Sequence, residues 1–290
     1  MKKQNIGYLA IAASALVFGF TPILSAITYQ LGNNGINMAF LRAAIPIPIF
    51  LLICRKSAFP GRKQLMTGIL AGCLSFGCTL LLYSSYEYIS PGLATTLHFL
   101  YPLYVAVITS FRKHKRLRTG YIIGLALAIL GIVLFVNPED MHGKAVGYIL
   151  ALASGVVYSM YVVLLDKESD NPLPLYQLML IISCTGVVLC GTVGLALGKL
   201  TIMTSGKGWF FACLVALLAA VVGSVLFQVG VRKTGGTNAA IFSLLEPISS
   251  VLFSVTILGD VLTPKTVLGC VLIICGLVAV TVSNIKKQAA

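Results

Sequence analysis

Long runs of apolar residues recur along the whole chain, and short polar segments separate them. A helix needs about 20 apolar residues to cross a hydrocarbon core of ~30 Å. The pattern therefore predicts ten membrane-spanning helices and places the protein in the all-α integral membrane class. The predicted spans cover residues 7–28, 36–54, 65–86, 91–111, 119–136, 145–165, 173–197, 209–230, 237–258 and 264–282.

The composition supports lipid as the solvent of this chain. Hydrophobic residues make up 58% of the 290 positions and charged residues only 10%, which excludes an ordinary soluble fold. The loops between the spans are too short for a soluble ATPase module, and the sequence contains no GxxxxGK[ST] phosphate-binding motif. Energy for any work on a solute must then come from gradients of ions or solutes.

The formal charge of +13 follows the predicted loops. Sixteen of the 21 Lys and Arg residues lie at the termini or in loops on one side, against four lysines on the other, and Arg42 alone lies inside a span. The positive-inside rule then predicts that both termini are cytoplasmic, in a cell membrane that the chain crosses many times. The basic excess indicates topology and attraction to anionic lipid, and it argues against a nucleic-acid partner.

The two halves of the sequence resemble each other. Residues 7–18 (GYLAIAASALVF) match residues 147–158 (GYILALASGVVY) at an offset of 140, and Pro102, Gly124 and Gly131 recur as Pro247, Gly269 and Gly276 at an offset of 145. We predict two units, residues 1–140 and 141–290, each with five spans. Because five is odd, the second unit enters the membrane from the opposite side, as in inverted-repeat carriers that work by alternating access.

Residues 244–264 (LLEPISSVLFSVTILGDVLTP), with Gly269 and Gly276 after them, resemble the closing signature of the EamA family, part of the drug/metabolite transporter superfamily. Asp260 stands where the family pattern has a second Glu. Further similarities are Phe40-Leu41-Arg42 in the second span and Tyr101-Pro102-Leu103 in the fourth. The resemblance implies a secondary transporter that exports or exchanges small metabolites, amino acids or drug-like solutes.

Two charged residues within predicted spans are candidates for the transport step. Glu246 lies about nine residues into its span, roughly 13 Å deep at 1.5 Å per residue. A carboxylate at that depth costs on the order of 2.5 to 3.5 kcal/mol, so it should be protonated, paired or facing a wet cavity. Arg42 lies about six residues from the outer side, near 9 Å. Arg42 either extends to the interface or forms a packing ion pair, or else it binds a solute carboxylate or pairs with Glu246 during gating.

Other polar and aromatic residues within the spans extend this predicted pathway. His98 and Tyr101 share one helix face, and their repeat counterparts Ser243 and Glu246 keep the same spacing of three. Each of these residues has an alternative role in packing. The further pathway candidates are Ser14, Phe18, Ser154 and Tyr158, and the candidates for a kink or gate are Pro102 and Pro247. The glycine pairs seven residues apart, Gly124 with Gly131 and Gly269 with Gly276, predict close helix contacts.

The sequence argues against cofactors and catalysis. The eight cysteines lie in apolar surroundings without a CxxC pair, and we expect no metal site and no cofactor. A polytopic membrane enzyme is the main alternative, with a channel or receptor as a third class, but we find no HExxH motif and no nucleophile with a base. With one Arg and no Lys inside the spans, a multiply charged phosphate ester fits poorly. Proton coupling or facilitated diffusion, and a monomer or a homodimer, all fit the sequence.

Overall fold

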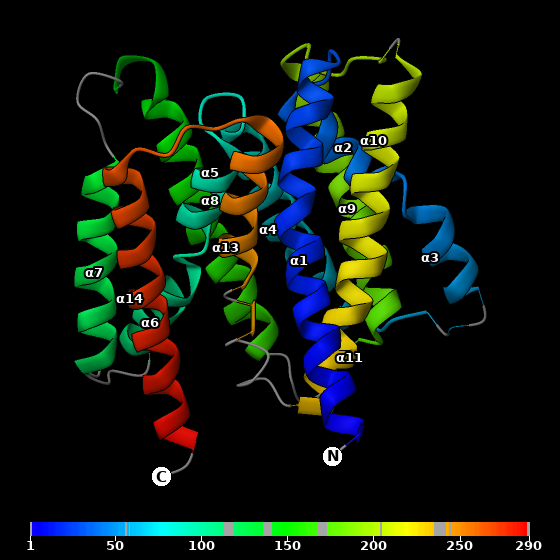
Figure 1. The fold of residues 1–290 in the computed structure, drawn as a ribbon. Helices are drawn as coiled ribbons and strands as arrows, with labels where there is room; N and C mark the ends of the chain where they lie inside the picture. Colours follow the sequence, from blue (N-terminus) through cyan, green and yellow to red (C-terminus); the bar gives the residue numbers. More distant parts are fainter. Residues whose placement is uncertain are drawn as a thin grey trace.

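The computed structural model describes residues 2–55, 57, 59–112, 119–135, 141–167, 173–203, 205–234, 242–243 and 245–288. Within these ranges the chain is helical and contains no strand, which confirms the predicted all-α class. Figure 1 shows helices running side by side as a bundle, with the two chain termini at the same end.

Six helical segments in the described ranges are long and apolar enough to cross a membrane. They comprise α1 (Lys2–Gln30), α2 (Gly35–Ala44) together with α3 (Ile47–Cys54), α4 (Arg62–Ser85), α8 (Met141–Lys167), α9 (Leu175–Ala196), and α10 (Gly206–Leu217) continued into α11 (Ser224–Thr234). The remaining helices are α5 (Pro91–His98), α6 (Tyr101–Arg112), α7 (Thr119–Phe135), α13 (Leu245–Phe253) and α14 (Pro264–Gln288).

Two of the predicted spans are broken near their middle. Within the predicted span 36–54, helix α2 ends before Ile45 and helix α3 begins after Pro46. Within the predicted span 91–111, α5 ends at His98 and α6 begins at Tyr101. Proline removes the backbone donor that would bond the carbonyl four residues before it. Pro102 therefore leaves the carbonyl of His98 without its helical donor, which accounts for the second break.

Other spans contain wider, π-helical turns. Residues Leu218–Gly223 connect α10 to α11, and residues Ser254–Leu258 extend α13. The hydroxyl of Ser14 on α1 donates a hydrogen bond of 2.8 Å to the carbonyl of Gly223. This bond fixes α1 against the first of the two turns.

Each half contributes a long first helix that packs on the other half. Helix α1 packs against α10, α11 and α13, and α8 packs against α4, α5 and α6. Figure 1 shows α1 in the middle of the bundle, next to α13 on one side and α10 on the other. Glycines allow the close approach, since a Cβ at Gly155 of α8 would lie 2.9 Å from the His98 carbonyl oxygen.

The α7–α14 pair stands at the edge of the bundle and is held by reciprocal glycine contacts (Figure 1). A Cβ at Gly131 would lie 2.7 Å from the carbonyl oxygen of Gly269, and a Cβ at Gly276 would lie 2.7 Å from that of Gly124. The close helix contacts predicted at these glycines are confirmed. The pair Gly124 and Gly131 on α7 packs against the pair Gly269 and Gly276 on α14.

At the end of the bundle opposite the termini, polar contacts fix the start of α2. The Glu87 carboxylate accepts a hydrogen bond of 2.7 Å from the backbone N–H of Gly35, and Lys199 Nζ lies 3.8 Å from the same carboxylate. The Asn34 side chain accepts from the Asn37 N–H at 2.9 Å and thereby caps the helix. These contacts hold the helix that carries Arg42.

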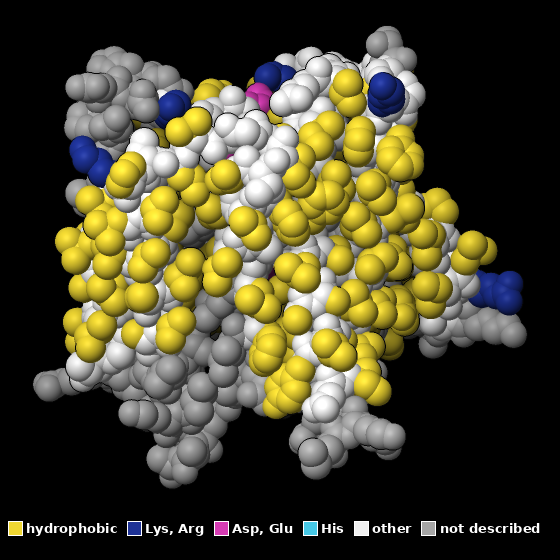
Figure 2. Space-filling model, viewed as in Figure 1, with side chains coloured by type: hydrophobic (Ala, Val, Ile, Leu, Met, Phe, Trp, Pro, Cys, Tyr) yellow, Lys and Arg dark blue, Asp and Glu magenta, His cyan; other side chains and the backbone are white. Residues whose placement is uncertain are grey.

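The outer surface is apolar around the middle of the bundle. Figure 2 shows hydrophobic side chains over the central part of this face, with Lys and Arg side chains at its margins. Large apolar side chains are exposed on several helices, among them Leu9, Ile149 and Val188. This surface matches a multi-pass membrane protein whose middle contacts lipid chains.

Candidate functional site

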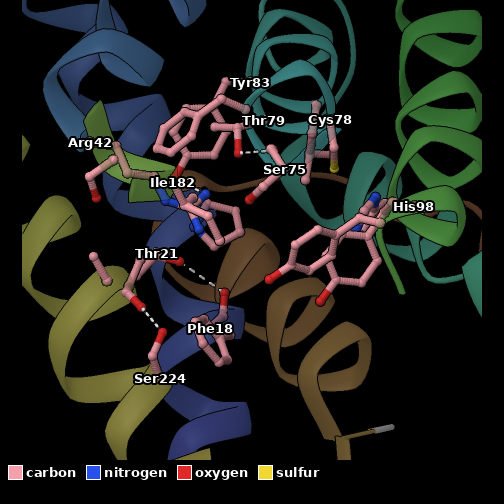
Figure 3. A pocket seen from close by; sticks show the side chains of 18 of the residues that line it. Phe18, Thr21, Arg42, Ser75, Cys78, Thr79, Tyr83, His98, Ile182 and Ser224 are labelled. Atoms are coloured by element: carbon pink, nitrogen blue, oxygen red, sulfur yellow. Dashed lines mark hydrogen bonds between the residues drawn. The ribbon is translucent and has the colours of Figure 1, made fainter. Parts of the chain in front are cut away.

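A cavity of about 230 Å³ lies inside the bundle and is lined by residues from both halves. One water molecule needs roughly 10–15 Å³ of such space, so the cavity has room for a small organic solute. Its wall is formed by α1, α2, α3, α4, α5, α8, α9, α11, α13 and the π-helical turn after α10. Figure 3 shows Arg42 and His98 at opposite sides of this space. Thr21 and Ser224 lie in the lower part of the same view.

Arg42 is a cation on the wall of this cavity. Its Nη1 donates a hydrogen bond of 3.2 Å to the hydroxyl of Tyr83, and its guanidinium carbon lies 5.4 Å from the centre of the same ring. Among the described residues, Arg42 forms no ion pair. Within the part of the chain that the structure describes, the other four N–H donors of the guanidinium make no hydrogen bond.

Glu246 lines the same cavity from the first turn of α13. Its carboxylate makes no hydrogen bond and no ion pair with the described residues, so more than 4.0 Å separates it from Arg42. A Cβ at Gly19 of α1 would lie 2.8 Å from the Glu246 carbonyl oxygen, which shows how closely α1 approaches here. The backbone of Glu246 is therefore fixed while its acidic group faces the cavity.

The imidazole of His98 is oriented by a serine on α8. Ser154 donates its hydroxyl proton to the Ala151 carbonyl at 2.6 Å, and its oxygen lies 3.0 Å from His98 Nδ1. Because the single hydroxyl proton is committed to Ala151, His98 Nδ1 carries a proton and donates to Ser154. Nε2 of a neutral His98 is then the acceptor.

Aromatic rings form the wall next to His98. The Tyr158 ring lies 5.3 Å from the imidazole and packs edge-on against Tyr101 at 4.7 Å, while Tyr161 lies 5.5 Å from Tyr158. The Tyr158–Tyr101 pair is edge-to-face and the other two contacts are tilted, and such ring pairs stabilise a fixed arrangement. The site therefore combines one cation, one acid and an aromatic surface.

Three prolines follow cavity residues at a spacing of four. The pairs are Phe18 and Pro22, Arg42 and Pro46, and His98 and Pro102. Each proline removes the helical donor of the earlier residue's carbonyl. The Thr21 hydroxyl replaces that donor for the Phe18 carbonyl at 3.0 Å, whereas the helix breaks after the other two.

The structure brings most of the predicted pathway residues to one place. Arg42, His98, Glu246, Phe18 and Tyr158 line the cavity. Tyr101 packs behind Tyr158, and Ser154 holds His98. Ser14 is buried against Gly223, and Ser243, Pro102 and Pro247 lie outside the lining. Whether these residues take part in transport stays a prediction.

Several lining residues were not singled out from the sequence. They include Tyr83 and Tyr86 at the end of α4 and Thr95 on α5. Thr95 stands three residues before His98, and Tyr86 stands three residues after Tyr83. Because residues three apart share a helix face, this spacing was the sequence signal that could have identified them as lining residues.

Comparisons with known proteins agree on one family. The model of the EamA-like transporter family matches the chain twice, over residues 5–137 and 145–282. The uncharacterized transporter YcbK of Bacillus subtilis is 24% identical over 93% of this chain and 91% of its own length. The riboflavin transporter ImpX of Fusobacterium nucleatum is 23% identical over 96% of this chain and 98% of its own length.

A solved crystal structure shares the fold. It aligns with a TM-score of 0.63 over 98% of each chain at 17% sequence identity. At that identity, the likeness concerns the arrangement of the helices alone.

Proposed function

The chain belongs to the EamA-like transporter family, and on that premise we propose that it exports a small solute through the central cavity by alternating access. Family and fold make it a multi-pass membrane transporter of small solutes in the cell membrane.

One observation carries the proposal. The cavity presents Arg42 and Glu246, a cation and an acid that do not pair with each other. Charged groups within a membrane are costly, and they mark solute or ion pathways when they face an internal cavity. A cation and an acid that do not pair with each other favour a solute that itself carries an acidic group and an amine, such as an amino acid.

Many carriers that work by alternating access are built from two structurally related halves. The family model matches residues 5–137 and 145–282 separately, and the contacts of Gly131 and Gly276 are equivalent under the repeat offset of 145. Both facts support two inverted units of five spans, 1–140 and 141–290. A rocking motion of such units would expose the cavity to one side of the membrane at a time.

Transport itself is tested with the purified chain in proteoliposomes. We expect counterflow of at least one labelled amino acid into vesicles preloaded with the same unlabelled compound, and none in vesicles without protein. Repeating the measurement with a pH gradient separates proton coupling, which gives accumulation, from facilitated diffusion, which gives equilibration. If a broad panel of amino acids, amines and cationic dyes shows no protein-dependent flux, the proposed function is wrong.

The predicted orientation gives a second test, in a bacterial host. A fluorescent protein fused after Gln288 should fluoresce, because it folds in the cytoplasm, whereas alkaline phosphatase inserted after Gly198 should be active outside. We expect each reporter to be silent when the two positions are exchanged. The reverse pattern would contradict cytoplasmic termini.

A further inference from the structure

The two ring nitrogens of His98 have different surroundings. The side chain is 7% exposed and lines the central cavity. Nδ1 lies 3.0 Å from the Ser154 oxygen and donates to it. Nε2 makes no hydrogen bond with the described residues, and it is not sealed off by neighbouring atoms. His98 therefore bonds to the protein through one nitrogen and leaves the other to the cavity.

Helix α8 holds both the backbone and the side chain of His98. Gly155 lets α8 come close, since a Cβ there would lie 2.9 Å from the His98 carbonyl oxygen. Ser154, the preceding residue, is fully buried and accepts from Nδ1. The rings of Tyr101 and Tyr158 lie 5.9 and 5.3 Å from the imidazole. The imidazole cannot turn without losing the Ser154 bond, and a group held in this way binds with a defined geometry.

A second serine on α8 shows what Ser154 adds to ordinary packing. Ser159 is also fully buried and donates to the Val156 carbonyl at 2.6 Å, as Ser154 donates to the Ala151 carbonyl at 2.6 Å. A serine of this kind is satisfied by its own helix. Of the two, Ser154 is the one that accepts from His98, so this extra bond serves the imidazole.

An imidazole inside a membrane protein points to a polar pathway when it faces a cavity. Ionisable residues in membrane spans are rare, and those that face an internal cavity mark solute or ion paths. A buried acceptor is also costly while it lacks a donor. Nε2 of a neutral His98 has a lone pair and no proton, so its partner must supply an O–H or N–H group.

The position of His98 indicates which part of a solute it contacts. Arg42 and His98 lie at opposite sides of the cavity (Figure 3). The guanidinium of Arg42 suits an acidic group, and the Glu246 carboxylate suits an amine, because charge-assisted hydrogen bonds are the strong kind. The uncharged acceptor of His98 then suits an uncharged donor on the rest of the solute.

We propose that neutral His98 selects the transported solute by accepting a hydrogen bond at Nε2 from a hydroxyl or N–H group of the solute side chain. The solute is then an amino acid whose side chain carries an uncharged donor. Ser154 acts through His98 as a positioning residue. This inference rests on the proposed function and adds the residue that recognises the side chain.

The test compares amino acids that have similar shapes and differ in the donor. The purified full chain in detergent is titrated by calorimetry with three pairs: L-threonine and L-valine, L-asparagine and L-leucine, and L-tyrosine and L-phenylalanine. The variants are His98→Phe and Ser154→Ala. Ser159→Ala is the matched control, because Ser159 has the same burial and the same backbone bond as Ser154 but does not line the cavity.

We expect the wild type to bind the donor-bearing member of at least one pair about 10- to 100-fold more tightly, because the other member leaves Nε2 without a donor. His98→Phe should reduce this ratio to within about 2-fold by weakening the donor-bearing member alone. Ser154→Ala should reduce the ratio several-fold, and Ser159→Ala should leave it unchanged.

The protonation of the imidazole provides a readout that needs no ligand. His114→Gln and His142→Gln leave His98 as the single histidine of the chain. In the ¹⁵N spectrum of that chain near neutral pH, we expect a proton on Nδ1 and none on Nε2, and a mixture of the two tautomers once Ser154→Ala is added. A proton on Nε2 in the presence of Ser154 would overturn the proposal. This readout and Ser154→Ala also decide the matter if His98→Phe does not fold.

Four binding outcomes would also overturn the role of His98: equal affinities within every pair, a ratio that persists in His98→Phe, equal weakening of both members of a pair, or a wild type that binds none of the six probes. The proposed function survives these outcomes if the vesicles still transport another solute. Conversely, selective binding without any flux in vesicles would retain the role of His98 in binding and remove the transport proposal.

Discussion

Replacing Glu246 with glutamine should lower the initial rate of solute counterflow by roughly 10- to 100-fold, the equivalent of one charge-assisted hydrogen bond to the solute amine. Glu246 lines the cavity, and its carboxylate makes no hydrogen bond or ion pair with the described residues, so we expect a ligand to be its partner. The amide has the same shape and leaves the packing around Gly19 intact. Flux is measured in proteoliposomes that contain equal amounts of folded protein.

The folded yield separates this expectation from a structural role. A charge near the membrane centre costs about 2.5–3.5 kcal/mol, so Glu246→Gln should insert and melt at least as well as the wild type. Arg42→Ala is the companion variant and should also impair flux while insertion stays normal. Unchanged flux in both variants would exclude these residues from the mechanism, and a loss of folded protein would assign them to structure.

Gly276→Ala should reduce the stability of the protein by about 1–3 kcal/mol, the usual cost of an overpacked contact. The new Cβ would lie 2.7 Å from the carbonyl oxygen of Gly124, a backbone atom that cannot move aside without shifting α7. In an open helix the same substitution normally stabilises by roughly 0.5–1 kcal/mol, so the expected sign is reversed. The melting temperature in detergent measures the difference.

Gly206→Ala is the matched control, because no atom lies within 4 Å of the position that its Cβ would take. Gly131→Ala should resemble Gly276→Ala, since its Cβ would meet the carbonyl of Gly269 at the same 2.7 Å. Equal melting temperatures for Gly206→Ala and Gly276→Ala would show that the two helices can separate at no cost. The close packing of α7 on α14 would then be a wrong description.

The helices were predictable from the sequence because a helix that crosses the lipid core needs about 20 mostly apolar residues. Long apolar runs predicted the positions of α1, α4, α8 and α9 to within a few residues. The break of the second span at Pro46 was not predicted, since a proline within an apolar run is often accommodated by a small kink. The π-helical turn before Ser224 was not predicted either, and its Gly223 carbonyl accepts a hydrogen bond from Ser14 on α1, a contact between residues 209 positions apart.

The candidate site was predictable where a residue type is rare. Arg42 and Glu246 are charges in apolar spans, and such residues stand out at once. Tyr86 and Thr95 do not, because hydroxyl side chains in membrane helices usually bond to their own backbone. Only the structure shows that these two hydroxyls lack a bond to their own backbone.

The first helix of each half packs on the other half, and this affects how the chain assembles during synthesis. Helix α1 leaves the ribosome first, but its main packing partners are α10, α11 and α13, which follow about two thirds of the chain later. Domains generally fold as units, the N-terminal one first during synthesis, but α1 has most of its contacts in the second half. The nascent first half must therefore remain in the bilayer with α1 surrounded by lipid or insertion factors, and its final packing is delayed until the second half has entered the membrane.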